Sequence, residues 1–150
     1  MGGGMGGMGG MGMGGMGGGF MNVKPEVVGD FKVPTVCLEH GKKEPRPKMN
    51  YVIKPIEEFT DNAEIREVCR MLGTGELNQR AAQAASWHFS DGMSWRQLAA
   101  KQLRFANGTS QPYFSPAEIR LAMQIASTAT RLAKEHSRKS PGKSDSLSQQ

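Results

Sequence analysis

Apolar residues recur at helical spacing through the second half of the chain. The first candidate helix follows a segment similar to a capping box, DNAE at positions 61–64, and Gly73 supplies its stop. Its apolar residues stand at i, i+3, i+4 and i+7: Ile65, Val68, Cys69 and Leu72. This spacing places them on one face of an amphipathic helix.

The second candidate helix, residues 79–89, is apolar on nearly every side. Asn78 stands at the cap position, and a run of alanines with Trp87 and Phe89 leaves almost no polar face. Helices of this kind are buried on most sides. We therefore expect this helix at the centre of the fold.

Two further helices follow clear start signals. Ser94 and Gln97 form a capping-box pattern before an apolar stripe that ends at Asn107-Gly108. The stripe consists of Trp95, Leu98, Ala99, Leu103 and Ala106. The segment SPAE at positions 115–118 combines a serine cap, a proline at the first helical position and an acid at the third. We expect this last helix to pack a broad face and to run to about Glu135.

Two short strands are predicted ahead of the helices. Positions 33–38 read VPTVCL and positions 51–56 read YVIKPI, and each contains a proline that restricts it to a sheet edge. The residues between them are rich in charge and turn formers. The economical interpretation is a short hairpin with an extended loop.

These elements define an α-rich α+β fold, in which a short β-hairpin packs on a bundle of about four helices. Residues 24–136 form a single globular domain. The leader, residues 1–23, is dominated by glycine and methionine and carries no charge. It recovers too little apolar contact to offset its backbone entropy, so we expect it to be disordered. The polar residues 137–150 are expected to form a disordered tail.

The chain is basic, with a formal net charge of +5 over 150 residues. Its lysines and arginines are spread along the chain, which is typical of solvated surface and argues against a nucleic-acid partner. No apolar run is long enough to span a membrane. If Met1 is the true start, the lack of a signal peptide predicts a cytoplasmic protein, whereas a start further upstream would be compatible with an extracytoplasmic one.

One polar side chain stands out on the alanine-rich helix. Burying the Gln83 carboxamide without a partner would cost about 1–3 kcal/mol, so it must have one. The first possibility is a backbone group of the predicted hairpin. The second is the thiol of Cys37, which could attack the carboxamide, expel ammonia and leave an internal thioester.

The segments VCLEHGKKEPRPKMNYVI and AQAASWHFSDGMSW, within about residues 33–98, resemble the thioester domains of bacterial surface adhesins. In those domains a strand cysteine is bonded to a glutamine of a T-Q-x-A-type helical motif that an aromatic residue follows. The resemblance implies that Cys37 is the thiol partner and Gln83 the acyl partner, with His40 and Trp87 in support. Ala82 occupies the threonine position, which leaves open a relative that kept the scaffold without the bond.

Other uses of the cysteines stay open at this point. In an exported domain, a disulfide between Cys37 and Cys69 would contribute about 2–5 kcal/mol. Cys37, His40, Cys69 and His88 could supply four zinc ligands, but the second pair lacks a close spacing. We rank the metal below the disulfide and predict neither a metal nor a cofactor.

The sequence therefore favours a non-enzymatic binding or structural module, exported or associated with the cell envelope of a bacterium. Its expected partner is a protein or another cell-surface component. One alternative is a covalent adhesin-like domain that uses the Cys37–Gln83 thioester, and a further alternative is a weak nucleic-acid-binding protein.

Overall fold

A computed structural model of the chain describes residues 29, 32–43 and 45–139. The predicted leader, the start of the predicted domain at residue 24 and the part of the predicted tail beyond residue 139 lie outside the described residues. The chain divides into two compact units at Lys32, and the elements below all belong to the unit that begins at Val33.

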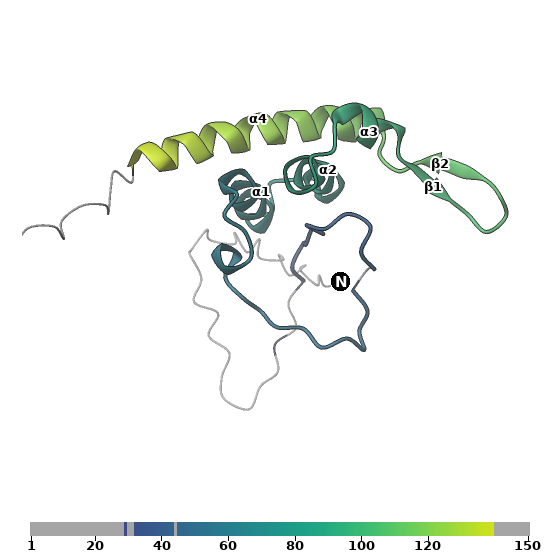
Figure 1. Ribbon diagram of the computed structural model, residues 1–150, viewed down its shortest axis with the longest axis horizontal. Coiled ribbons are helices and arrows are strands. Elements are labelled where there is room, and N and C mark those ends of the chain that lie inside the picture. The colour runs from purple at the N-terminus through teal and green to yellow at the C-terminus, as the bar shows by residue number, and fades with distance from the viewer. Residues whose placement is uncertain (1–28, 30–31, 44, 140–150) are drawn as a thin grey trace, which may run out of the picture. The chain divides into compact units, whose positions relative to one another are not determined.

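The described part of this unit contains four α-helices, as the sequence pattern predicts, in the order α1 (Ala63–Gly73), α2 (Gln79–Ser90), α3 (Trp95–Ala100) and α4 (Pro116–Lys139). A short 3-10 helix, η1 (Ile56–Glu58), precedes α1. A two-stranded antiparallel sheet, β1 (Gln102–Arg104) and β2 (Ser110–Pro112), lies between α3 and α4. The α-rich α+β class is thus confirmed (Figure 1).

The predicted helix starts hold because the capping side chains make the expected hydrogen bonds. Asn62 caps α1 and Asn78 caps α2, each by accepting a hydrogen bond from a backbone N–H of the first turn. Ser94 and Gln97 form a complete capping box at α3. Ser115 and Glu118 do the same at α4, where each side chain accepts from the other's backbone N–H. These caps satisfy amide groups that the helices leave unpaired.

The last helix is longer than predicted, since it runs to Lys139. The prediction that residues 137–139 belong to a disordered tail is therefore wrong. Ser137 is held in the last turns because its hydroxyl donates to the Ala133 carbonyl at 2.9 Å. The basic residues Arg138 and Lys139 also favour the helix, because cations stabilise the negative end of its dipole.

The hairpin lies elsewhere in the chain than predicted. Residues 33–38 and 51–55 form no strand, and Ile56 begins η1. The third helix ends at Ala100, so β1 takes up residues predicted to complete that helix, and β2 follows its predicted stop at Asn107-Gly108. Asn107 and Gly108 direct this outcome: Asn107 accepts hydrogen bonds from Thr109, and Gly108 adopts a φ of +84°. An Asn-Gly pair at this conformation favours a hairpin turn over a helix stop.

The core lies where α1 and α2 pack against α4. Alanines make this close approach possible, because four alanines of α2 and four of α4 are buried completely or nearly so. Larger side chains fill the remaining space, chiefly Val68, Leu72, Leu98 and Phe114. Among the described residues, no helix is both long and apolar enough to cross a membrane.

Candidate functional site

Four side chains along α2, spaced four residues apart, form a polar and aromatic stripe. They are Gln79, Gln83, Trp87 and, at the C-cap, Asp91. Residues at this spacing lie on one face of a helix. Residues 35–40, which we call the strap, lie along this stripe without forming a strand.

Hydrogen bonds fasten the strap to the stripe at three levels. Gln79 Nε2 donates to the Thr35 carbonyl at 2.7 Å, and the His40 N–H donates to Asp91 Oδ1 at 3.1 Å. Between them, Gln83 contacts Cys37. Thr35 and Cys37 are two residues apart, and their partners Gln79 and Gln83 are four residues apart. The two spacings match because two residues of extended chain span about 6.6 Å and four helical residues rise by roughly 6 Å. The strap therefore follows α2 without a change of register between Thr35 and Cys37.

The central contact joins both backbone groups of Cys37 to the carboxamide of Gln83. The Cys37 N–H donates to Gln83 Oε1 at 2.7 Å, and Gln83 Nε2 donates to the Cys37 carbonyl at 2.7 Å. The two residues predicted to form the site are thus brought together. Because the carboxamide is held at both ends, its plane is fixed beside the cysteine.

The side chain of Cys37 is a free thiol. Its Sγ donates a hydrogen bond to the Glu39 carbonyl at 3.2 Å, within the strap itself. The backbone of Cys37 satisfies Gln83 in the way that the simpler interpretation of the sequence requires. The thiol itself makes no hydrogen bond to the carboxamide; the contact between the two residues runs through the Cys37 backbone.

His40 and Trp87, the two supporting residues, also meet. Their rings make an edge-to-face contact with centroids 4.8 Å apart. Lys101 lies beside both: its Nζ is 2.8 Å from His40 Nε2 and 5.4 Å from the centre of the Trp87 ring. This Lys101 position gives a cation–π contact with Trp87. An ammonium group has donors only, so the His40 ring accepts at Nε2.

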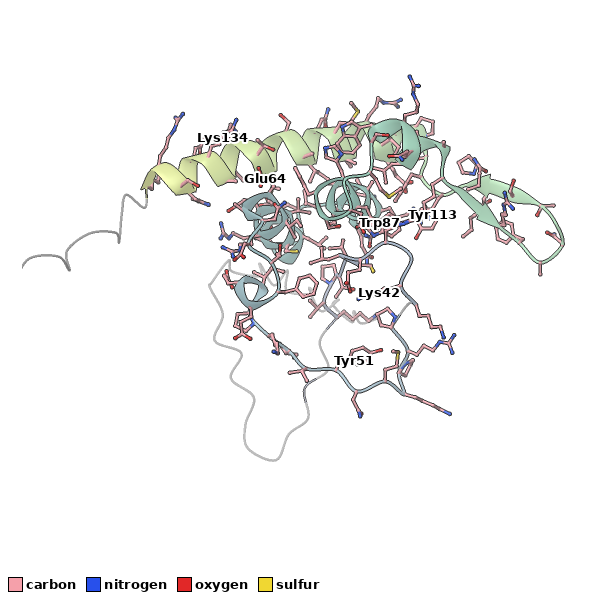
Figure 2. The ribbon with its side chains drawn as sticks, in the orientation of Figure 1. Lys42, Tyr51, Glu64, Trp87, Tyr113 and Lys134 are labelled. Carbon is pink, nitrogen blue, oxygen red and sulfur yellow. The ribbon has the colours of Figure 1, made fainter. Side chains whose placement is uncertain are left out.

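Trp87 is buried, with 6 % of its surface exposed. Its aromatic neighbours besides His40 are Tyr113 and Phe114, with ring centroids at 5.6 and 5.9 Å. Tyr113 and Phe114 lie on the segment that leads into α4, and Figure 2 shows Tyr113 beside Trp87. Trp87 Nε1 is the one buried side-chain nitrogen or oxygen without a hydrogen-bond partner in the described part of the chain.

A pocket of about 230 Å³ opens beside Gln83, lined by Gln79, Arg80, Gln83, Tyr113 and Phe114. Arg80 holds one wall in place because it donates to Glu118 Oε1 at 2.8 Å and to the Tyr113 carbonyl. Burial by itself raises the pKa of Glu118, but hydrogen bonds from Ser115 and Arg80 and the charge of Arg80 outweigh it, so the pKa is lowered overall. Arg80 and Glu118 therefore form an ion pair beside the pocket at neutral pH.

Neither the disulfide nor the zinc site that the sequence left open is formed by the described residues. Cys69 is a free, half-buried thiol on α1, and burial raises its pKa. No Cys37–Cys69 disulfide is present. His88 stacks on Trp95 at 4.2 Å, and its Nδ1 lies 2.8 Å from the Met93 carbonyl. Within residues 32–43 and 45–139, no three histidine, cysteine, aspartate or glutamate side chains gather as metal ligands.

Sequence reasoning missed Gln79, Asp91, Lys101 and Tyr113 as members of the site. The four-residue spacing from Gln83 to Trp87 could have identified Gln79 and Asp91, because it continues in both directions along one helix face. Lys101 and Tyr113 carry no such signal, since the hairpin that positions them was not predicted. No protein-family model, curated protein or solved structure matches this chain.

Proposed function

We propose that this chain is a non-enzymatic binding module that captures a partner amine through an internal thioester between Cys37 and Gln83. The observation that supports this best is the pair of hydrogen bonds between the Cys37 backbone and the Gln83 carboxamide. They hold the acyl carbon beside the residue that bears the thiol. Positioning of this kind replaces an encounter between two mobile groups.

The bond-forming step balances without a cofactor. Cys37 Sγ attacks Gln83 Cδ, the C–Nε2 bond breaks, and the thiol proton leaves with the nitrogen as ammonia. When a partner amine then attacks Cδ, the C–S bond breaks, an amide forms and the thiol is regenerated. Each chain reacts once in this scheme, so the module is consumed rather than turned over and is not an enzyme.

The surroundings of Gln83 support both halves of this chemistry. The Cys37 N–H already donates to Gln83 Oε1, where negative charge develops during either attack. The buried Trp87 and the Tyr113 and Phe114 rings limit access of water to the neighbouring face. The pocket beside Gln83 offers an entry for the partner amine.

A covalent binding reaction of this kind suits a protein that faces its partner outside the cytoplasm. We therefore propose a bacterial module, exported or associated with the cell envelope, that binds a protein or another cell-surface component. A nucleic-acid partner has less support than a protein or cell-surface partner, because the basic residues are spread along the chain and form no single cluster in the sequence.

A second candidate function is a binding module of the same architecture without the covalent bond. The hydrogen bond from Cys37 Sγ to the Glu39 carbonyl favours it, as does the complete pairing of the Gln83 carboxamide. In that case Gln83 fastens the strap, and partner binding is reversible.

Exposure of the purified protein to methylamine separates the two candidates. We expect the wild type to gain one methylamine at Gln83, as measured by peptide mass spectrometry. Cys37→Ala and Gln83→Ala should gain none. Cys69→Ala is the matched control, because Cys69 is on α1 and belongs neither to the strap nor to the stripe on α2, so its loss should leave labelling intact. A wild type that stays unlabelled would leave the reversible module as the function.

A further inference from the structure

A second cavity, of about 440 Å³, lies between α1 and the last turns of α4. It is separate from the strap and does not depend on the proposed thioester. Its charged lining comprises Glu57, Arg66, Glu67, Arg70, His136 and Lys139. Cavities that bind small ligands are commonly of this size.

A buried carboxylate organises one wall of this cavity. The side chain of Glu67 is 5 % exposed, and both of its oxygens accept from Arg70 Nη1, at 2.8 and 3.0 Å. His136 Nδ1 lies 2.8 Å from Glu67 Oε1. Arg70 Nη1 also lies 3.2 Å from His136 Nδ1, so the carboxylate, the guanidinium and the imidazole form one cluster. Glu67 thus fixes the orientation of one guanidinium and one imidazole.

The cations that line the cavity keep donors available. Arg66 uses Nε and Nη2 to hold the Thr60 carbonyl at 3.0 and 2.7 Å, which anchors the guanidinium. Its Nη1, the Nε and Nη2 of Arg70 and the Nζ of Lys139 have no hydrogen-bond partner among the described residues. A guanidinium held on one side and free on the other is suited to a planar or tetrahedral oxyanion.

The charge balance agrees with this preference. Arg66, Arg70 and Lys139 contribute three positive charges, and Glu57 and Glu67 contribute two negative ones, so the lining carries +1 with His136 neutral. Glu67 is already paired with Arg70, and Asp61, outside the lining, lies 3.5 Å from Arg66 Nη2, which leaves the exposed Glu57 as the lining acid that opposes an anion. We propose that this cavity is a binding site for a phosphate group, with Arg66, Arg70 and Lys139 as its donors.

Titration with inorganic phosphate tests this site directly. Amide chemical shifts of the full chain are followed by NMR at constant ionic strength, with chloride replacing phosphate. We expect saturable changes at residues of α1 and the end of α4, with a Kd on the order of 1 mM. Acetate should bind several-fold more weakly, because it offers two acceptor oxygens and a single charge.

Variants separate a ligand site from a structural ion-pair cluster. Lys139→Gln should weaken phosphate binding about tenfold and lower the melting temperature only slightly, since its amine holds no described partner and it contributes only to the helix dipole. Arg70→Gln should weaken binding further and also lower the melting temperature, because Glu67 loses its pair. Arg131→Gln is the control: Arg131 lies on α4, pairs with Glu135 and does not line the cavity.

Three results would overturn the proposal. The first is an absence of saturable shifts at phosphate concentrations on the order of 10 mM. The second is unchanged phosphate affinity in Lys139→Gln. The third is an equal loss of affinity in Arg131→Gln, which would show that only the overall charge of the chain attracts the anion.

Discussion

At the scale of single residues, Gln83 is a polar side chain whose burial would be unfavourable without hydrogen bonds, and it fastens the strap to α2. It lies on a helix whose buried residues are mostly alanine, and the strap backbone supplies both of its hydrogen bonds. The need for a partner could be predicted from the sequence, because an unpaired amide in that position is unfavourable. Of the two partners that the sequence left open, a backbone group and the Cys37 thiol, the structure shows the backbone of Cys37 making both hydrogen bonds.

Trp87 carries the largest predicted effect of a single substitution on stability. Trp87→Ala should lower the free energy of unfolding by about 3–5 kcal/mol, because a buried ring in contact with three other rings is removed. Trp87→Phe should cost clearly less, since it keeps an aromatic ring and eliminates the unpaired indole N–H. Chemical denaturation measures both. Equal losses for the two variants would mean that Nε1 has a partner in solution.

At the scale of elements, the helices could be predicted from their capping residues, whereas the strands could not. All four helix starts could be located because each carries a side chain that pairs with the first-turn amides. The β-branched residues at 33–38 and 51–56 indicate strands that do not form, whereas the Asn-Gly turn at 107–108 joins the two strands that do. The side chains of α2, rather than a neighbouring strand, satisfy the backbone of the strap, and strand propensity contains no information on that choice.

The start of α4 yields a pH-dependent prediction. The folded pKa of Glu118 is lowered, so its charged form stabilises the fold at neutral pH, and this contribution is lost as the pH falls through the folded pKa. Glu118→Gln should therefore be less stable than the wild type by about 0.5–1 kcal/mol at neutral pH. The difference should shrink below the ordinary glutamate pKa of about 4.3.

Thermal denaturation across this pH range measures the Glu118 effect. Glu135→Gln is the control on the same helix, because Glu135 is exposed to a greater degree and pairs with Arg131 within one turn. Its effect should stay below about 0.5 kcal/mol at every pH. A Glu118 difference that does not change between neutral and acidic pH would show that the charge is not what stabilises the start of α4.

At the scale of the whole molecule, two regions with different chemistry lie on the same helical scaffold. The strap, α2 and the segment before α4 bring together the thiol-bearing residue, the carboxamide and an aromatic surround. The opposite part of α4, with α1, forms the charged cavity. The fold class and the Cys37–Gln83 proximity were accessible from sequence. The cavity was not, because its residues are far apart in the chain and each reads as ordinary helix surface.

The central claim is tested most directly by the intact mass of the purified protein under denaturing, non-reducing conditions. An internal thioester predicts a mass lower than that of the sequence by one ammonia, and Cys37→Ala and Gln83→Ala should each show the full mass of their own sequences. A wild-type mass equal to that of the unmodified sequence, in protein never exposed to amines, would contradict the covalent account.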